Sequence, residues 1–114
     1  MRVTDIYDDV LTILERLGVP AIKQRVFFVY LNQAIGEILT MYPDNAIEGN
    51  GEQPRIDELT DGIYLKNEFF DAIVSDIVFL SGGGDEWQSR FMRSAQLVSE
   101  NLNKHTGKRI RKRR

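Results

Sequence analysis

The 114-residue chain contains no cysteine and a single histidine, and these two shortages exclude several kinds of chemistry. Without cysteine the chain can form neither a disulfide framework nor a thiolate metal site, which is compatible with a reducing compartment. The histidine, His105, follows the last apolar residue of the last predicted helix, where no neighbouring structure would hold its ring as a base. Zinc sites and Cys–His or Ser–His–Asp nucleophiles are therefore not expected.

The sequence also lacks a long uninterrupted hydrophobic run. Its first ten residues, MRVTDIYDDV, include no apolar run behind a positive region, so no signal peptide is expected there. The most apolar long stretch, residues 26–42, is interrupted by Asn32, Gln33 and Glu37, which are costly in hydrocarbon. We therefore expect no membrane-spanning segment and no membrane partner.

The composition is that of an ordinary globular protein, but its charge is polarised along the chain. Hydrophobic residues make up 42% and charged residues 28%, and the length is that of one domain. Residues 1–103 carry 8 basic and 17 acidic residues, a formal charge of −9, whereas residues 104–114 carry seven Lys or Arg and no acid. We divide the chain into a helical domain, 1–103, and a basic tail, 104–114. Because its like charges repel one another, we expect the basic tail to be disordered.

Apolar residues recur at three- and four-residue steps in four stretches, and this spacing predicts four helices. They cover residues 4–17, ended by Gly18, residues 22–42, ended by Pro43, residues 67–80, and residues 85 to about 103. The third is apolar over most of its circumference, so we expect it to be the most buried. The fold class is therefore all-α, and we predict a small four-helix bundle, with the helices antiparallel or arranged as two hairpins.

Two glycine-containing connections are candidates for function. Residues 44–65, between the second and third helices, are rich in acids, Gly and Pro and predict a long loop that is functional or mobile. Within it, Asn50-Gly51 favours a tight turn, and hence a small hairpin over residues 46–56. The triple glycine before Asp85 and Glu86 predicts a helix connector, because a phosphate-binding loop would follow a strand and end in Lys-Ser/Thr. Gly36, inside the second helix, indicates either a close helix crossing or a tolerated weak point.

Clustered carboxylates are the remaining candidates for catalysis. They are Asp8/Asp9, Asp57/Glu58/Asp61, Asp71/Asp76 and Asp85/Glu86. Each cluster falls on a predicted solvent face or helix cap, so we interpret all of them as solvated charges. A cation site with oxygen ligands in the 44–61 loop remains an alternative, although the EF-hand spacing is absent. We expect no catalytic residue, no metal and no cofactor, and we do not expect an enzyme.

Helix 22–42 has more apolar surface than a small bundle can bury. Most aromatic residues occur at core spacing, so we interpret them as packing residues and not as platforms for stacked bases. Val26, Val29 and Tyr30, however, lie away from the core stripe of this helix. A second apolar face of this kind suggests a protein partner.

Three stretches together resemble a known family. They read FFVYLNQAIGEILTMYPD, LTDGIYLKNEFFDAIVSDIVFL and DEWQSRFMRSAQLVSENL, and over about residues 4–103 the chain is similar to the small head-tail connector (adaptor) proteins of tailed bacteriophages. The family's second helix commonly carries Tyr-Leu-Asn-x-Ala-x-x-Glu-Ile, matched by Tyr30, Leu31, Asn32, Ala34, Glu37 and Ile38. The start of its third helix is matched by Leu65, Phe69 or Phe70, Ala72 and Ile73. These are packing patterns, and the long basic tail departs from them.

The resemblance implies a structural virion protein, made in the host cytoplasm and located in the neck between head and tail. It implies a homo-oligomeric ring that binds the portal protein and a tail or second connector protein and continues the DNA channel. A closed ring needs two different patches on each subunit, and the long loop could reach a neighbour. The expected interface residues are Val26, Val29, Tyr30, Ile47, Asn50 and Ile56.

The basic tail has two candidate targets, an acidic protein surface or the DNA in the channel. We favour protein, on a neighbouring subunit or the portal, because Ile110 supplies an apolar anchor that DNA would not require. The expected contact residues are Lys104, Lys108, Arg109, Ile110, Arg111, Lys112, Arg113 and Arg114.

The alternative is a small nucleic-acid-binding or regulatory protein that uses the basic tail as an electrostatic arm. Against it, the body of the protein is acidic and would repel phosphate, and no predicted helix has a basic face. The turn at residues 17–20 has about the length found in a helix-turn-helix, but the helix after it is too apolar for a recognition helix.

Overall fold

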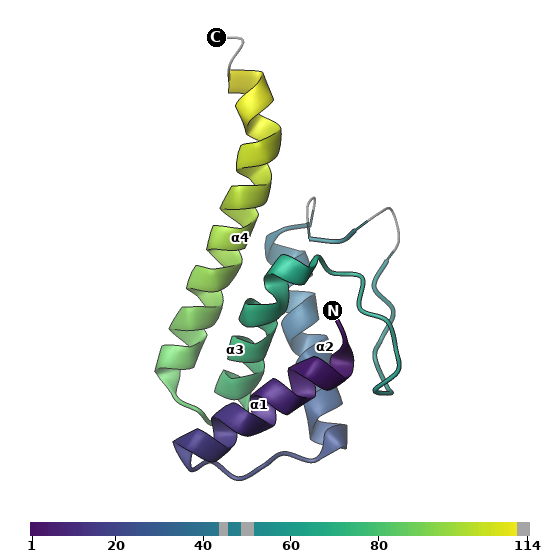
Figure 1. Cartoon of the computed structure of the whole chain (residues 1–114), viewed down its shortest axis with the longest axis vertical. Coiled ribbons are helices and arrows are strands. Elements are labelled where there is room, and N and C mark those ends of the chain that lie inside the picture. The colour runs from purple at the N-terminus through teal and green to yellow at the C-terminus, as the bar shows by residue number, and fades with distance from the viewer. Residues whose placement is uncertain (44–45, 49–51, 112–114) are drawn as a thin grey trace.

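The computed structural model describes residues 1–43, 46–48 and 52–111, with side chains described as far as residue 102 (Figure 1). It contains four α-helices and one short 3₁₀ helix, and the described residues form no strand longer than isolated bridges. The helices are α1 (Val3–Leu17), α2 (Gln24–Met41), α3 (Phe70–Leu80) and α4 (Asp85–Arg111), and the 3₁₀ helix η1 is Asn67–Phe69. The all-α class is confirmed.

Helix α3 is the centre of the fold. It packs against α1, α2 and α4, whereas α2 and α4 make little direct contact with each other. Every residue from position 72 to 78 is buried, so the expectation that this helix is the most buried is confirmed. Helix α1 crosses obliquely in front of α2 and α3, and α4 runs beside α3 (Figure 1). The largest fully buried side chains are Phe27, Phe69, Ile6, Leu14, Leu31, Ile38, Ile56, Leu65, Ile73 and Ile77.

Glycines shape the two short connections as expected. Gly18 ends α1 in the left-handed region with φ 72°, and its N–H donates to the Glu15 carbonyl at 3.1 Å. Between α3 and α4, Gly82 and Gly84 have φ of 100° and 111°, which side chains other than glycine rarely adopt. A Cβ on Gly83 would lie 2.6 Å from a methyl group of Val78. The triple glycine is therefore a tight helix connector.

Gly36 has a different environment. It is exposed on α2, and no described atom outside its own helix lies within 4 Å of a Cβ built on it. Of the two interpretations, the close helix crossing is wrong within this chain. The position instead lies on an open part of the α2 surface.

The segment between α2 and η1 folds back onto the body of the protein. Residue Ile47 forms an antiparallel bridge with Leu65, supported by backbone bonds from Glu48 to Tyr64 (2.9 Å) and from Lys66 to Ala46 (2.8 Å). The predicted hairpin over residues 46–56 is therefore wrong in its pairing, because 46–48 pairs with 64–66. Its proposed turn, at positions 50 and 51, lies outside the described residues.

Asn32 attaches the same segment to α2. Its side-chain amide donates to the Ile56 carbonyl and its carbonyl accepts the Ile56 N–H, both at 2.8 Å. The Ile56 side chain is fully buried in the core. Ile56 therefore cannot be the interface residue that we expected, since its side chain is already used within its own chain.

Helix α4 continues to Arg111, well past the expected end near residue 103. Its last turns extend beyond all the other elements, along the longest axis of the molecule (Figure 1). We expected the basic tail to be disordered, and the structure gives residues 104–111 a helical backbone. Residues 112–114 lie outside the described part of the chain.

Candidate functional site

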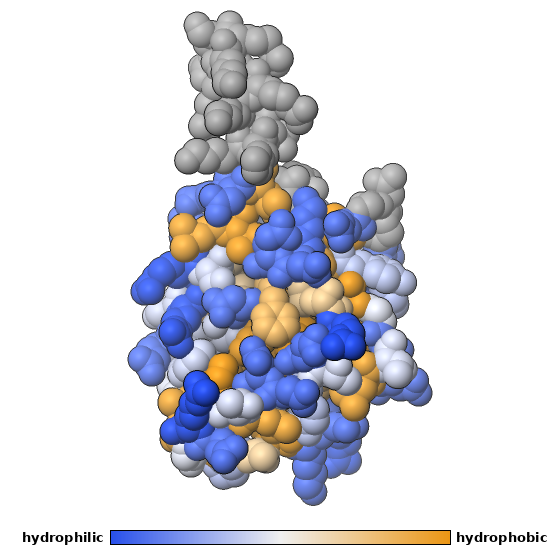
Figure 2. Space-filling model, viewed as in Figure 1, coloured by the Kyte–Doolittle hydropathy of each residue, from blue (hydrophilic) through white to orange (hydrophobic). Residues whose placement is uncertain are grey.

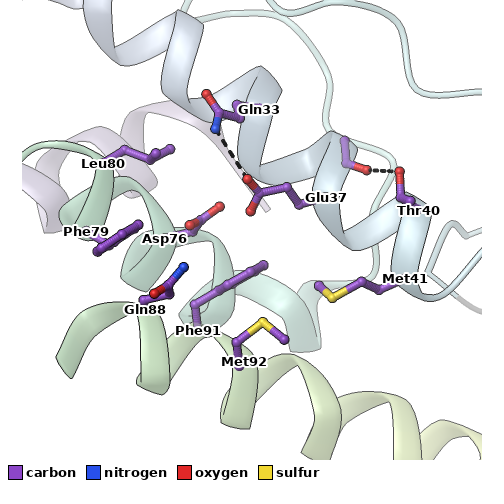
Figure 3. Close-up of a pocket in the computed structure, with 11 residues that line it drawn as sticks. Gln33, Glu37, Thr40, Met41, Asp76, Phe79, Leu80, Gln88, Phe91 and Met92 are labelled. Carbon is purple, nitrogen blue, oxygen red and sulfur yellow. Dashed lines mark hydrogen bonds between the residues drawn. The ribbon is translucent and has the colours of Figure 1, made fainter. Parts of the chain in front are cut away.

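A groove opens between α2 and α4, because both helices pack on α3 without closing on each other. Its volume is about 710 Å³, and α3 forms its floor. The α2 wall is polar, with Gln33, Glu37 and Thr40, whereas Phe91 and Met92 of α4 make the opposite wall largely apolar (Figure 3). Among the described residues that line the groove there is no Lys, Arg or His.

A pair of carboxyl groups lies in this groove, one from α2 and one from α3. Asp76 is only 2% exposed, and the Glu37 side chain extends from α2 toward it (Figure 3). Gln33 donates to Glu37 Oε1 at 3.3 Å. The Oδ2 atom of Asp76 is buried and has no hydrogen-bond partner among the described residues. This oxygen accepts no hydrogen bond from the described residues, and the only polar neighbour that affects Asp76 among them is the Glu37 carboxyl group.

Burial is the largest cause that raises the pKa of Asp76 from 3.8 to about 8, and a hydrogen bond with Glu37 and the charge of Glu37 act in the same direction. At neutral pH the Asp76 carboxyl group is thus mostly protonated and uncharged. If a cation entered the groove, its charge would favour the ionised form and release this proton. The chemistry available here is the binding of a positively charged, hydrogen-bond-donating group.

The sequence interpretation of Asp76 was wrong. Asp71 and Asp76 were assigned together to a solvent face, and only Asp71 is exposed. Helix α3 is covered by three other helices, so a carboxyl group in its middle turn is covered too. The available signal was an acid inside the apolar run AIVSDIVFL. Glu37 was missed as its partner because the two residues are 39 positions apart in the sequence.

The apolar face predicted on α2 lies next to the groove. Val29 is 49% exposed, and Val26 and Tyr30 are half-buried. From Val26 the steps to Tyr30, Gln33 and Glu37 are four, three and four residues, which places all of them on one side of the helix. The predicted partner face and the groove therefore form one continuous surface along α2.

The other predicted interface residues are placed differently. Ile47 is half-buried and packs against the core, and Ile56 is fully buried. Asn50 lies outside the described residues. The basic tail contributes helical backbone at residues 104–111, all beyond the groove-lining part of α4.

Outside the groove and the adjoining α2 face, the described residues show fewer features of a binding site. On the face seen in Figure 2, hydrophobic and hydrophilic side chains are interspersed and form no single broad apolar area. Within the described part of the chain, no three His, Cys, Asp or Glu side chains gather as a metal site would require. In the long loop the Asp61 carboxylate accepts the N–H groups of Asp57 and Glu58, at 2.8 and 3.0 Å. None of the described helices is both long and apolar enough to cross a membrane.

Comparison with known proteins adds no relative to this picture. The chain matches no family model, and neither a curated protein nor a solved structure matches it significantly.

Proposed function

We propose that the chain is a structural assembly protein of the phage head-tail connector type. It forms a homo-oligomeric ring in the neck of the virion, binds the portal protein on one side and a tail or second connector protein on the other, and continues the DNA channel. The observation that carries this proposal is the continuous surface along α2, where an open groove and an apolar face lie together. A small domain with no need of a partner would bury such a surface.

The residues that match the connector pattern support the proposal, because they have separate structural roles. Leu31, Ala34 and Ile38 are buried in the core. Asn32 attaches the long loop to α2, and Glu37 faces the groove. The pattern thus includes residues that build the core, hold the long loop on α2 and face the groove. Together these roles allow α2 to present one defined surface to a partner.

The projecting end of α4 also fits a ring. In a heterologous ring each subunit offers two different surfaces to its two neighbours. The groove side of α2 and the far end of α4 are two such surfaces, at separate places on the molecule (Figure 1).

The test is the mass of the protein in solution, alone and mixed with the portal protein of the same genome, with Val29→Asp as the disruptive variant. Val29 is more suitable than Tyr30, because Tyr30 partly packs against the core. We expect Val29→Asp to keep its helical circular dichroism and to lose ring formation. Leu97→Asp is the control, since Leu97 is a similarly exposed apolar residue on α4. If both variants assemble normally, the α2 face is not an interface.

The alternative, a nucleic-acid-binding protein, is favoured by one observation: the helix of α4 continues through a stretch dense in Lys and Arg. This protein would bind random duplex DNA at low salt. Its affinity would fall with salt with a log–log slope of about −6 for seven phosphate contacts. An affinity that is unchanged on deleting 104–114 would exclude this function.

A further inference from the structure

The groove between α2 and α4 has the features of a binding site for a cationic side chain. Its buried acceptor, Asp76 Oδ2, lacks a donor among the described residues, and Glu37 adds a second carboxyl group beside it. The apolar side chains of Phe91 and Met92 face the carboxyl pair across the groove (Figure 3). A Lys or Arg side chain suits both halves, since its methylene stem covers apolar surface while its charged end donates hydrogen bonds.

The chain carries such a ligand in its own sequence. The basic tail has seven Lys or Arg and no acid, and Ile110 adds an apolar side chain. It cannot reach the groove of its own chain while α4 is continuous. Met92 lines the groove, and at a rise of about 1.5 Å per residue Lys104 lies roughly 18 Å farther along the helix and Arg111 roughly 28 Å. The groove of another molecule has no such restriction.

We propose that the groove between α2 and α4 of one copy binds the basic tail of a second copy, with Lys or Arg side chains donating to Glu37 and Asp76. The inference rests on the self-association in the proposed function and names the contact that produces it. The Asp76 proton leaves to solvent as the cation arrives. Because the two surfaces differ, the contact is head-to-tail and repeats from copy to copy, as a ring requires.

Disulfide crosslinking tests this contact directly, because the native chain has no cysteine. One preparation carries Met92→Cys at the groove, where Met92 is 48% exposed, and the other carries Ile110→Cys. Mixed and oxidised, they should form a heterodimer joined by a disulfide between positions 92 and 110, identified by mass spectrometry. The control replaces Met92→Cys with Leu97→Cys, because Leu97 is 54% exposed on the same helix but points about 140° away. We expect a several-fold lower yield of heterodimer in the control.

Charge variants test the role of the carboxyl pair. Asp76→Asn and Glu37→Gln keep the shape of each side chain and remove its ability to become charged, so each should lower the association by roughly tenfold or more. Asp71→Asn, exposed on the same helix as Asp76, controls for net charge and should change little. Circular dichroism should be unaltered in all three. Raising the salt concentration should weaken the crosslinking of the Met92→Cys preparation in which Glu37 and Asp76 are both intact.

The outcomes separate this inference from the proposed function. Equal crosslinking at positions 92 and 97, or no effect of both Asp76→Asn and Glu37→Gln, would overturn the inference even if the chain binds the portal. Specific crosslinking between positions 92 and 110 in a chain that does not bind the portal protein would support the inference and count against the connector role. Selective crosslinking of the Met92→Cys groove to portal protein would show that a second copy does not occupy the groove. Binding of the basic tail to DNA alone would lead to the same conclusion.

Discussion

Replacing Asp76 with Asn should make the folded protein less sensitive to pH. In the native chain the Asp76 side chain is buried beside Glu37, and its pKa is raised from 3.8 to about 8 by burial first, then by the hydrogen bond to Glu37 and the Glu37 charge. The unfolded chain exposes the same group to water, where its pKa is ordinary. Folding therefore takes up a proton at every pH between these two values.

The size of the effect follows from this difference. Below pH 3.8 the Asp76 carboxyl group is protonated in both states, so its burial carries no pH-dependent cost. Between 3.8 and 8 the free energy of unfolding falls by about 1.4 kcal/mol per pH unit, and above 8 the loss is complete and constant. From pH 5 to pH 7 the native chain thus loses about 3 kcal/mol of unfolding free energy through Asp76. The Asp76→Asn variant does not show this loss, because an Asn side chain does not ionise.

The assay is urea unfolding of both proteins at pH 5, 6, 7 and 9, at dilute protein concentration. Fluorescence of Trp87, the one tryptophan and a buried residue, reports the transition, together with circular dichroism. The stability of Asp76→Asn relative to the native chain should rise by about 3 kcal/mol from pH 5 to pH 7. Asp71→Asn is the control for the loss of one acid. A stability difference that stays constant over this range would refute the reasoning, as would a carboxyl resonance of Asp76 that titrates near its ordinary value.

Three further predictions, which use five substitutions, test the fold with the same unfolding experiment. Asn32→Ala should cost about 1–3 kcal/mol and speed hydrogen exchange at the Ile56 amide, because both backbone groups of Ile56 lose their partner; unchanged exchange would contradict the attachment. Ile56→Ala should cost roughly 2–5 kcal/mol while Val29→Ala stays within about 0.5 kcal/mol, and similar costs would mean that the two burial assignments are wrong. Gly36→Ala should stabilise by up to about 1 kcal/mol, whereas Gly83→Ala should destabilise by about 1–3 kcal/mol because its methyl group meets the end of α3. The opposite order would overturn the account of these glycines.

The positions of the first three helices were predictable from the sequence. Helix α1 was expected at 4–17 and is Val3–Leu17, and α2 was expected at 22–42 and is Gln24–Met41. Helical periodicity, a left-handed glycine and a proline are local properties, and neighbouring residues along the chain are enough to produce them. The end of α4 was not predictable in this way, because a change in composition after residue 103 was taken for a change in backbone structure.

The site depended on packing between residues distant in the sequence. Ile56 looked like a loop residue, and only its bonds to Asn32 and its place in the core show that it is structural. Asp76 looked like a solvated charge until α1, α2 and α4 covered α3. The sequence by itself determined where most helices form and that α2 has more apolar surface than the core can bury. The tertiary structure decided which carboxyl group loses its water, because that depends on which helices lie over it, and helical periodicity carries no information about that.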